Sequence, residues 1–223
     1  MPQQKSKKIF IYVFLFLFIG TFNNRNLSNF NFPNINKIHV TGLDEKNNLK
    51  LENDLSFLKI NNLFFTDKSK IVELINSHSL VEKYSVFIRY PSTLNIKIIQ
   101  TEFLAQIKKD GDYLLLGSNG KLIKNKGPQK NTPFIFGDLN NTSFFELKNA
   151  IDETEFEYKK IKNLYFFKSG RWDIETVDGL LIKLPKKELK KSLQLFIDVM
   201  SKNKDSKINK IDLRQFNQIV LSE

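Results

Sequence analysis

Apolar side chains form three kinds of pattern along the chain. One is an uncharged, almost wholly apolar run at residues 9–22. The second is helical spacing, with apolar side chains three and four residues apart. The third is alternation of apolar and polar side chains, which is typical of strands with one buried face. Together these patterns predict a membrane-proximal segment followed by a mixed α and β body.

The first pattern predicts a transmembrane anchor at 9–22 behind a short tail, 1–8, that carries three lysines. Fourteen helical residues span about 21 Å, which is short against a hydrocarbon core of ~30 Å and close to the length of a signal-peptide core. Snorkelling of Lys8 and local thinning of the bilayer can make up the difference. No Ala-x-Ala cleavage site follows, which favours an anchor over a cleaved signal, and the run has no amphipathic face to make it a core helix.

The lysines before the anchor predict that the amino terminus is cytoplasmic and that the rest of the chain is exported. An Asn-rich stretch with Pro33 then predicts a linker at 23–34.

Residues 35–100 predict a two-layer unit with the order β-α-α-β-β. Thr66 or Asp67 can cap the second helix, and Pro91 sets the turn between the last two strands. In chain order, we expect a strand at 35–42, helices at 49–58 and 67–78, and strands at 84–90 and 94–98.

The second half predicts a β-rich domain with two packed helices. Ser169-Gly170 and Asp178-Gly179 are typical two-residue hairpin turns. We expect strands at 112–123 (with a Ser-Asn-Gly turn), 133–139, 161–168, 171–177 and 180–184, and helices at 143–151 and 189–200. A last strand is expected at 211–221, because Ile211, Leu213, Ile219 and Leu221 share one parity.

Composition narrows the possible functions. The 223 residues carry a formal charge of +11 and a pI near 9.6, but Lys, Asn, Ile and Phe are all abundant. This breadth favours a compositional bias over a nucleic-acid surface, and no RNP or zinc-finger pattern is present. With no Cys and two His, thiolate sites and a His-built metal site are not expected.

No catalytic constellation assembles in the sequence. Two Ser-x-x-Lys matches, at Ser56 and Ser201, lack the partner motifs of that chemistry, and the phosphate-binding and nucleophile-elbow motifs are missing. The acidic residues at 152–157 lack the spacing of a calcium loop and are expected in solvent. We therefore expect neither an enzyme nor a cofactor.

Several segments, in the same order, resemble the FtsQ/DivIB cell-division family. VFIRYPSTLNIKI (86–98) resembles the hairpin of its POTRA domain, and DYLLLGSNGKLI (112–123) resembles the opening of its β-domain. RWDIETVDGLLIKLP (171–185) and IDLRQFNQIVL (211–221) resemble later β-domain motifs. In the last of these, Gln215 and Phe216 replace the family's Tyr and Pro.

The resemblance implies an α+β fold with a POTRA domain at 35–104 and a mixed antiparallel β-domain at 105–223 that ends in an exposed edge strand. Gln100 and Phe103 depart from the residues that usually link the two domains. The POTRA hairpin motif corresponds to Arg89, Tyr90, Pro91 and Leu94.

The resemblance also implies a non-enzymatic, single-pass protein of the bacterial inner membrane, with periplasmic domains and enrichment at the septum. Its implied partners are proteins resembling FtsB and FtsL at the β-domain, and FtsK or another division protein at the POTRA domain. The alternatives are another POTRA-bearing protein of outer-membrane assembly or secretion, or an envelope enzyme.

We expect a partner to add a strand at the last edge, because Ile219-Val220-Leu221 carries neither the Lys nor the Pro that usually blunts an edge. The resemblance makes Arg171 and Arg214 candidates for pairing with acidic residues of that partner. The expected partner-binding set is Arg171, Trp172, Arg214, Gln215, Phe216, Gln218, Ile219, Val220 and Leu221.

Overall fold

The computed structural model describes residues 3–22, 33–60, 67–202, 208–215 and 218–222, with side chains described except at 3–6, 21 and 22. The chain divides into two compact units. One comprises 1–41, 45–72 and 85–97, and the other comprises 42–44, 73–84 and 98–223. The domain boundaries that the sequence places at 34/35 and 104/105 stay a prediction.

Helix α1 (Gln3–Phe22) contains the apolar run, and it extends several residues before it. The side chains from Ile9 to Ile19 are all exposed. Within the described part of the chain, no helix is long and apolar enough to cross a membrane. The anchor at 9–22 stays a prediction.

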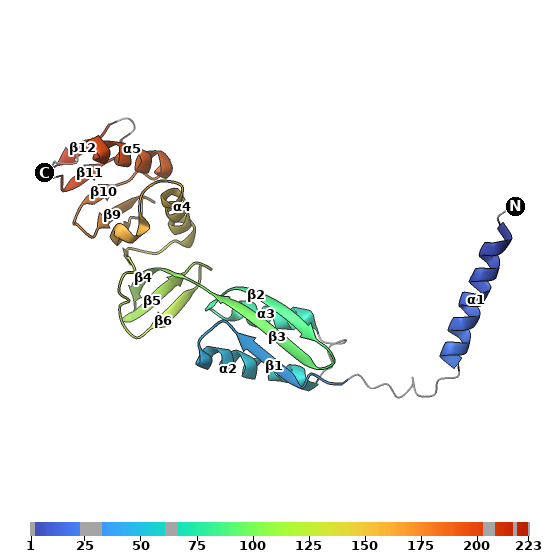
Figure 1. Cartoon of the computed structure of the whole chain (residues 1–223). Coiled ribbons are helices and arrows are strands. Elements are labelled where there is room, and N and C mark those ends of the chain that lie inside the picture. Colours follow the sequence, from blue (N-terminus) through green and yellow to red (C-terminus); the bar gives the residue numbers. More distant parts are fainter. Residues whose placement is uncertain (1–2, 23–32, 61–66, 203–207, 216–217, 223) are drawn as a thin grey trace. The chain divides into compact units, whose positions relative to one another are not determined.

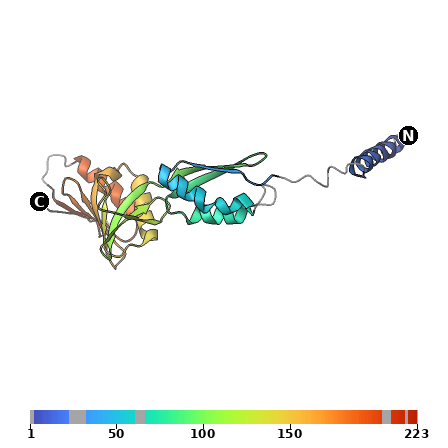
Figure 2. The same cartoon turned by 90° about the horizontal axis from the view of Figure 1, so that it is seen from below.

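The predicted β-α-α-β-β order is present. The elements are β1 (Lys37–Thr41), α2 (Glu45–Asp54), the 3-10 helix η2 (Ser56–Ile60), α3 (Lys68–Ser77), β2 (Val81–Arg89) and β3 (Thr93–Gln100). β1 lies parallel to β3, and the sheet order is β1-β3-β2. Helices α2 and α3 lie on one face of this sheet (Figure 2). The first helix lies four residues earlier than predicted, because α2 begins at Glu45 and ends at Asp54, where a 3-10 turn follows.

Local chemistry explains how these elements begin and pack. Asp67 caps α3 as predicted, since its carboxylate accepts from the backbone N–H of Ser69 at 2.9 Å. The core of the first unit consists of apolar side chains from β1, α2, η2, α3 and β3, with Ile35 before β1 and Leu55 between α2 and η2. These buried residues are Ile35, Ile38, Val40, Leu51, Leu55, Leu58, Ile71, Leu94 and Ile96.

The second unit is built on a nine-stranded sheet with the order β12-β11-β10-β9-β8-β7-β4-β5-β6 (Figure 1). Its strands are β4 (Phe103–Lys109), β5 (Asp112–Gly117), β6 (Leu122–Asn125), β7 (Phe134–Phe136), β8 (Ile161–Phe166), β9 (Trp172–Thr176), β10 (Leu181–Lys183), β11 (Lys210–Asp212) and β12 (Val220–Ser222). Three neighbouring pairs, β4-β7, β7-β8 and β10-β11, are parallel, so the sheet is mixed.

Two helices, α4 (Asn141–Asp152) and α5 (Leu189–Lys202), pack on the sheet as predicted, and the short 3-10 helix η3 (Tyr158–Lys160) precedes β8. Strand register aligns one residue from each of five neighbouring strands in a buried row: Ile135, Leu164, Ile174, Ile182 and Ile211. This row packs with Phe144, Leu147, Leu193 and Phe196 of the helices in one core.

The hairpin turns between β8, β9 and β10 fall at the predicted glycines, but each loop has three residues, 168–170 and 177–179, and the predicted two-residue turns are wrong. Gly170 and Gly179 have φ values of 81° and 89°, a region that glycine adopts without a steric penalty. The N–H of Gly170 donates to the carbonyl of Phe167, and that of Gly179 donates to Thr176. These turns fix the register of the strands that lead to the end of the sheet.

One buried polar side chain holds the connection before β7. The amide nitrogen of Gln106 on β4 donates to the carbonyls of Gln129 (2.9 Å) and Thr132 (2.7 Å), and its oxygen accepts from the N–H of Gln129 (2.8 Å). A segment without regular structure thus has its backbone groups paired, as burial requires.

Candidate partner-binding edge

The predicted final strand is two strands rather than one. β11 ends after Asp212 and β12 begins at Val220, antiparallel to β11, with Ile211 opposite Leu221. The Asp212 carboxylate accepts from the backbone N–H of Arg214 at 3.1 Å. Such a local bond takes a backbone donor away from a strand ladder. The continuous strand 211–221 is therefore wrong, and its shared parity reflects two short strands of one hairpin.

β12 forms the end of the sheet. Val220 and Leu221 are 53% and 43% exposed, while Ile219 packs partly against the core. Gln215 and Gln218 are exposed between the two strands, and Phe216 lies outside the described residues. The end strand of the sheet therefore presents two apolar side chains to solvent.

Backbone alternation shows which groups face the edge. Leu213 donates its N–H to Lys183 on β10, so Ile211, two residues earlier, also bonds toward β10. Lys210 and Asp212 then direct their N–H and C=O groups toward β12. Because Asp212 lies opposite Val220, the backbone of Val220 bonds inward and that of Leu221 faces outward.

The two candidate arginines already face carboxylates of their own chain. Arg214 donates from Nε and Nη2 to the Asp212 carboxylate at 2.8 and 2.5 Å. These bonds lower the pKa of Asp212 and raise that of Arg214. Arg171 Nε lies 3.7 Å from Asp173 Oδ1, and its guanidinium carbon lies 4.1 Å from the centre of the Phe167 ring. An acidic partner would have to compete with both internal carboxylates.

Asp173 is the buried acid of this group. It is 4% exposed, and burial raises its pKa, against the opposing effects of Arg171 and Lys183. By register, Lys183 lies between Asp173 and Asp212 on neighbouring strands. Alternating charges therefore run across β9, β10 and β11 toward the edge.

Trp172 does not belong to the surface. It is 1% exposed and packs against Phe166 and Phe144, with ring centroids 4.6 and 6.4 Å away. Its place in the expected partner-binding set is wrong, because the large ring fills the core beneath α4. Its neighbour Arg171 lies just before β9, and its guanidinium approaches Asp173 and the Phe167 ring.

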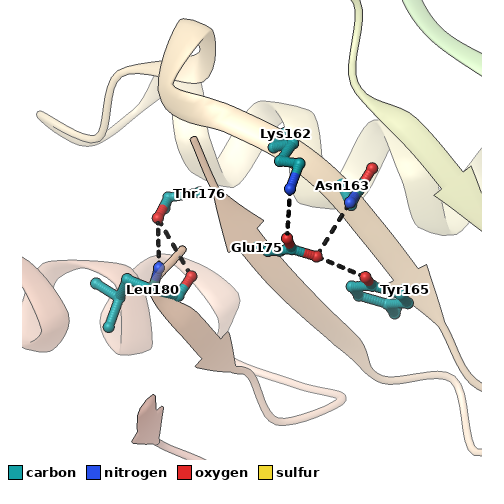
Figure 3. Close-up of polar contacts among 6 residues, drawn as sticks. All are labelled: Lys162, Asn163, Tyr165, Glu175, Thr176 and Leu180. Atoms are coloured by element: carbon teal, nitrogen blue, oxygen red, sulfur yellow. Dashed lines mark hydrogen bonds and ion pairs between the residues drawn. The ribbon is translucent and has the colours of Figure 1, made fainter. Parts of the chain in front are cut away.

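Sequence reasoning missed a polar cluster on β8 and β9 (Figure 3). Glu175 accepts hydrogen bonds from Asn163 (3.0 Å), Tyr165 (2.6 Å) and Lys162 (3.1 Å). The bonds from Asn163 and Tyr165, helped by Lys162, lower its pKa to about 2. Counting residues outward from a two-residue Ser169-Gly170 turn would have placed Glu175 opposite Leu164, one residue away from its observed partner Asn163.

A groove of about 540 Å³ lies beside the predicted residues Arg214 and Gln215. Leu195 of α5 and Leu213 contribute apolar lining, Lys187 adds a positive charge, and Lys191 forms an ion pair with Glu188 at 2.8 Å. Within the residues the structure describes, no group of three or more His, Cys, Asp or Glu could hold a metal ion.

The hairpin motif of the first unit divides between surface and core. Arg89, Tyr90 and Pro91 are exposed around the turn from β2 to β3, and the Tyr90-Pro91 peptide is cis. Leu94 is 1% exposed and lies opposite Ile38 of β1. Leu94 is therefore a core residue, and only the turn is available to a partner.

Comparisons with known proteins agree with these motifs. The model of the C-terminal region of cell division protein FtsQ/DivIB matches residues 105–214. Cell division protein DivIB of Staphylococcus aureus (strain NCTC 8325) is 24% identical over 155 residues, which are 65% of this chain and 34% of that protein. The chain thus matches about a third of that relative's length. Cell division protein FtsQ of Rickettsia bellii is 25% identical over 185 residues, 81% of this chain and 68% of that protein.

Among solved structures, the major extracytoplasmic domain of DivIB from Geobacillus stearothermophilus aligns with a TM-score of 0.36 and 13% identity. The alignment covers 48% of this chain and 98% of that domain. The family model matches a region that includes most of β4 and all of β5 to β11. The chain belongs to the FtsQ/DivIB family of cell division proteins.

Proposed function

We propose that this chain is a non-enzymatic scaffold of bacterial cell division that binds other division proteins at the β11–β12 end of its large sheet. Membership of the FtsQ/DivIB family supports a division role without catalysis. Proteins resembling FtsB and FtsL are the proposed partners at this end, and FtsK or another division protein is the proposed partner of the first unit.

Strand addition is the proposed mode of binding. The observation that carries it is the end of the sheet itself, where a three-residue strand exposes Val220 and Leu221 and carries no Lys or Pro. Edge strands that must stay unpaired usually carry such residues. Backbone pairing would supply affinity, and the groove beside Arg214 and Gln215 would supply specificity.

The test uses Leu221, whose backbone N–H faces outward from β12. Leu221→Pro removes this donor, so we expect the full-length chain, tagged and purified in detergent, to lose its division partner. Leu221→Ala keeps the N–H and should retain the partner. Thermal unfolding followed by circular dichroism checks that both variants stay folded. Equal recovery of the partner with both variants would contradict strand addition.

The cellular role has its own test. Cells depleted of the protein should grow as filaments, because septation fails, and a fluorescent fusion should concentrate at the septum. Normal septation in depleted cells would contradict the proposed role in cell division, even if the chain binds division proteins in extracts.

We also propose that α1 attaches the chain to the inner membrane with its amino terminus in the cytoplasm. The exposed apolar side chains from Ile9 to Ile19 support this, as do the lysines that precede them. Because the chain has no Cys, single cysteines can report topology. An impermeant maleimide should label Lys109→Cys in cells with a permeabilised outer envelope and label Gln3→Cys only after lysis. Labelling of both before lysis would refute this orientation.

A further inference from the structure

The turn between β2 and β3 lies at the end of the first unit where the chain enters it. The backbone N–H groups of Asn36, just before β1, and of Lys37, its first residue, donate to the carbonyl of Ser92 at 2.8 and 3.2 Å. Lys37 also lies opposite Thr93 in the parallel pairing of β1 with β3. The turn is therefore fixed beside the residues that connect this unit to the preceding part of the chain.

The hairpin displays apolar side chains on both sides of a strand. Val86, Phe87 and Ile88 are consecutive residues of β2, and they are 37%, 57% and 37% exposed. Because successive side chains of a strand point to opposite faces, neither face of β2 is fully covered at this point. Tyr90, in the turn, is 61% exposed. Large apolar side chains that are exposed together in this way are typical of an interaction surface.

The charges of the hairpin have one sign. Residues 83–100 contain three basic residues and no acidic one, and residues 33–43 contain Lys37 and no acidic one. Arg89 directly precedes Tyr90, and Lys37 lies opposite Thr93, so both exposed cations lie at the turn. Aromatic side chains beside basic ones are typical of protein surfaces that meet a bilayer, because the ring lies among the headgroups and the cation faces anionic lipid.

The helices add to this surface. The end of η2 and the beginning of α3 lie at the same end of the unit as the turn (Figure 1). Ile60, the last residue of η2, is 78% exposed. Lys59 and Lys68 are exposed beside it in the sequence, together with the acidic Asp67 that caps α3. Apolar and basic side chains therefore extend from the hairpin to the helical layer.

The length of the preceding chain allows this end of the unit to reach a membrane. Residues 23–36 separate the end of α1 at Phe22 from the beginning of β1 at Lys37. A chain of this length spans at most about 50 Å, even when fully extended. If α1 lies in the membrane, the turn belongs to the end of the unit at which the connection from the membrane arrives.

We propose that the β2–β3 hairpin docks on the surface of the bilayer that holds α1, with Phe87 and Tyr90 among the headgroups and with Arg89 and Lys37 facing anionic lipid phosphates. This inference rests on the proposed attachment of α1 to the membrane. It adds a second contact between the chain and the same bilayer. Docking would hold the first unit close to the membrane surface.

A bilayer explains the exposed side chains better than a protein strand does. A strand added to the edge of β2 would pair with its backbone and leave side chains on both faces in solvent. A hairpin that enters the headgroup layer brings both faces into contact with lipid. The three consecutive exposed residues of β2, at 86–88, therefore favour lipid as the occupant.

A fluorescent probe in the turn tests docking, because the chain has no Cys of its own. Ser92→Cys carries the polarity-sensitive dye NBD, and Lys46→Cys, at the exposed start of α2 and the opposite end of the unit, is the control. The full-length chain is inserted into nanodiscs of phosphatidylethanolamine and phosphatidylglycerol that contain nitroxide-labelled lipid. We expect blue-shifted and quenched emission at 92 and neither change at 46. Equal quenching at both positions, or none at 92, would overturn the inference.

Substitutions in the hairpin test which side chains hold it on the bilayer. In the chain labelled at 92, Phe87→Ser should reduce quenching, whereas Phe87→Leu, which stays apolar, should keep it. Arg89→Gln should lower the ratio of docked to undocked chain about fivefold in the anionic nanodiscs and leave it unchanged in phosphatidylcholine nanodiscs. Circular dichroism checks that the variants stay folded. Quenching that survives both Phe87→Ser and Arg89→Gln would contradict docking through these side chains.

A probe on α1 separates this inference from the proposed membrane attachment. In Gly20→Cys, a side chain near the end of α1 meets no other atom within 4 Å, so the dye is tolerated there. Quenching at 20 without quenching at 92 would refute docking and leave the attachment of α1 in place. No quenching at 20 would refute the attachment and, with it, docking. If Phe87→Ser loses a co-purified division protein while the probe at 92 stays unquenched, the hairpin binds protein and the inference is wrong.

Discussion

At one end of the large sheet, β6 pairs with β5 over four residue pairs, and its Lys124 forms an ion pair with Asp112 at 2.6 Å. At the other end, β12 pairs with β11 over three residue pairs and presents Val220 and Leu221 to solvent. Charge on an edge strand discourages pairing with another chain. The β6 end carries that protection, and the described residues of β12 do not. The two ends of one sheet therefore differ in how readily each could pair with another chain.

The largest effect is expected in β11, the strand that pairs with β12 at this end of the sheet. Ile211→Ala should lower the free energy of unfolding by about 2 to 5 kcal/mol, because the side chain is fully buried in the core. Urea unfolding followed by circular dichroism measures it. A loss below about 1 kcal/mol would mean that Ile211 of β11 contributes no more to stability than Leu221 of β12, and it would contradict the difference that we expect between these two strands.

A smaller effect is expected in the middle of the sheet, away from both ends. The pKa of Glu175 is about 2 in the folded protein, below its usual 4.5, so the unfolded chain binds more protons between these values. Its stabilising contribution is present above pH 4.5 and is lost as the pH falls toward 2. Because the side chain is 22% exposed, we discount the full shift for solvent screening and expect about 1 to 2 kcal/mol.

Glu175→Gln should remove this contribution at pH 7 and flatten the dependence of stability on pH between 4.5 and 2. Urea midpoints at several pH values measure both. The same slope in the variant and in the parent protein would mean that another carboxylate is responsible for it.

Lys124→Ile removes the charge that protects the β6 end of the sheet from pairing. Lys124→Ile should change the free energy of unfolding by less than about 1 kcal/mol, since exposed ion pairs contribute little. It should nevertheless cause concentration-dependent self-association in analytical ultracentrifugation, because an uncharged edge can pair with another copy. Lys124→Gln, which stays polar, is the control. A variant that stays as monomeric as the control would show that charge is not what guards this edge.

The smallest effect is expected at Leu221, directly opposite Ile211. Leu221→Ala should lower the free energy of unfolding by no more than about 1 kcal/mol, because 43% of the residue is already exposed. Urea unfolding of both variants gives the ratio of the two losses in unfolding free energy, and so compares the contributions of two residues that face each other on β11 and β12. A loss of unfolding free energy as large as that of Ile211→Ala would mean that β12 contributes as much to stability as β11 at this pair of residues.

The sequence predicted most elements of the fold for identifiable reasons. Helix α5 has a strong apolar period, and Gly170 and Gly179 mark turns that glycine adopts most easily. These signals are local, so no knowledge of distant contacts is needed. The prediction of one continuous final strand was wrong for a local reason as well. Alternation of apolar and polar side chains does not reveal that the Asp212 carboxylate accepts a hydrogen bond from the backbone N–H of Arg214.

The candidate site was harder to predict, because it depends on residues brought together across strands. Arg171 and Arg214 are recognisable as motif residues, but their pairing with Asp173 and Asp212 becomes visible only when side-chain geometry is known. Trp172 illustrates the same limit. Its position beside Arg171 in the motif says nothing about which of the two points into the core.

Gln106 has a consequence for how this sequence can diverge. Its one side chain completes three backbone hydrogen bonds of the segment before β7, and a leucine or methionine of similar size would leave all three unmade. A glutamate would turn a carboxylate toward two carbonyl oxygens. Relatives that share only about a quarter of their residues with this chain should therefore keep an amide at this position or reshape the whole connection. An alignment of close homologues would distinguish these two routes.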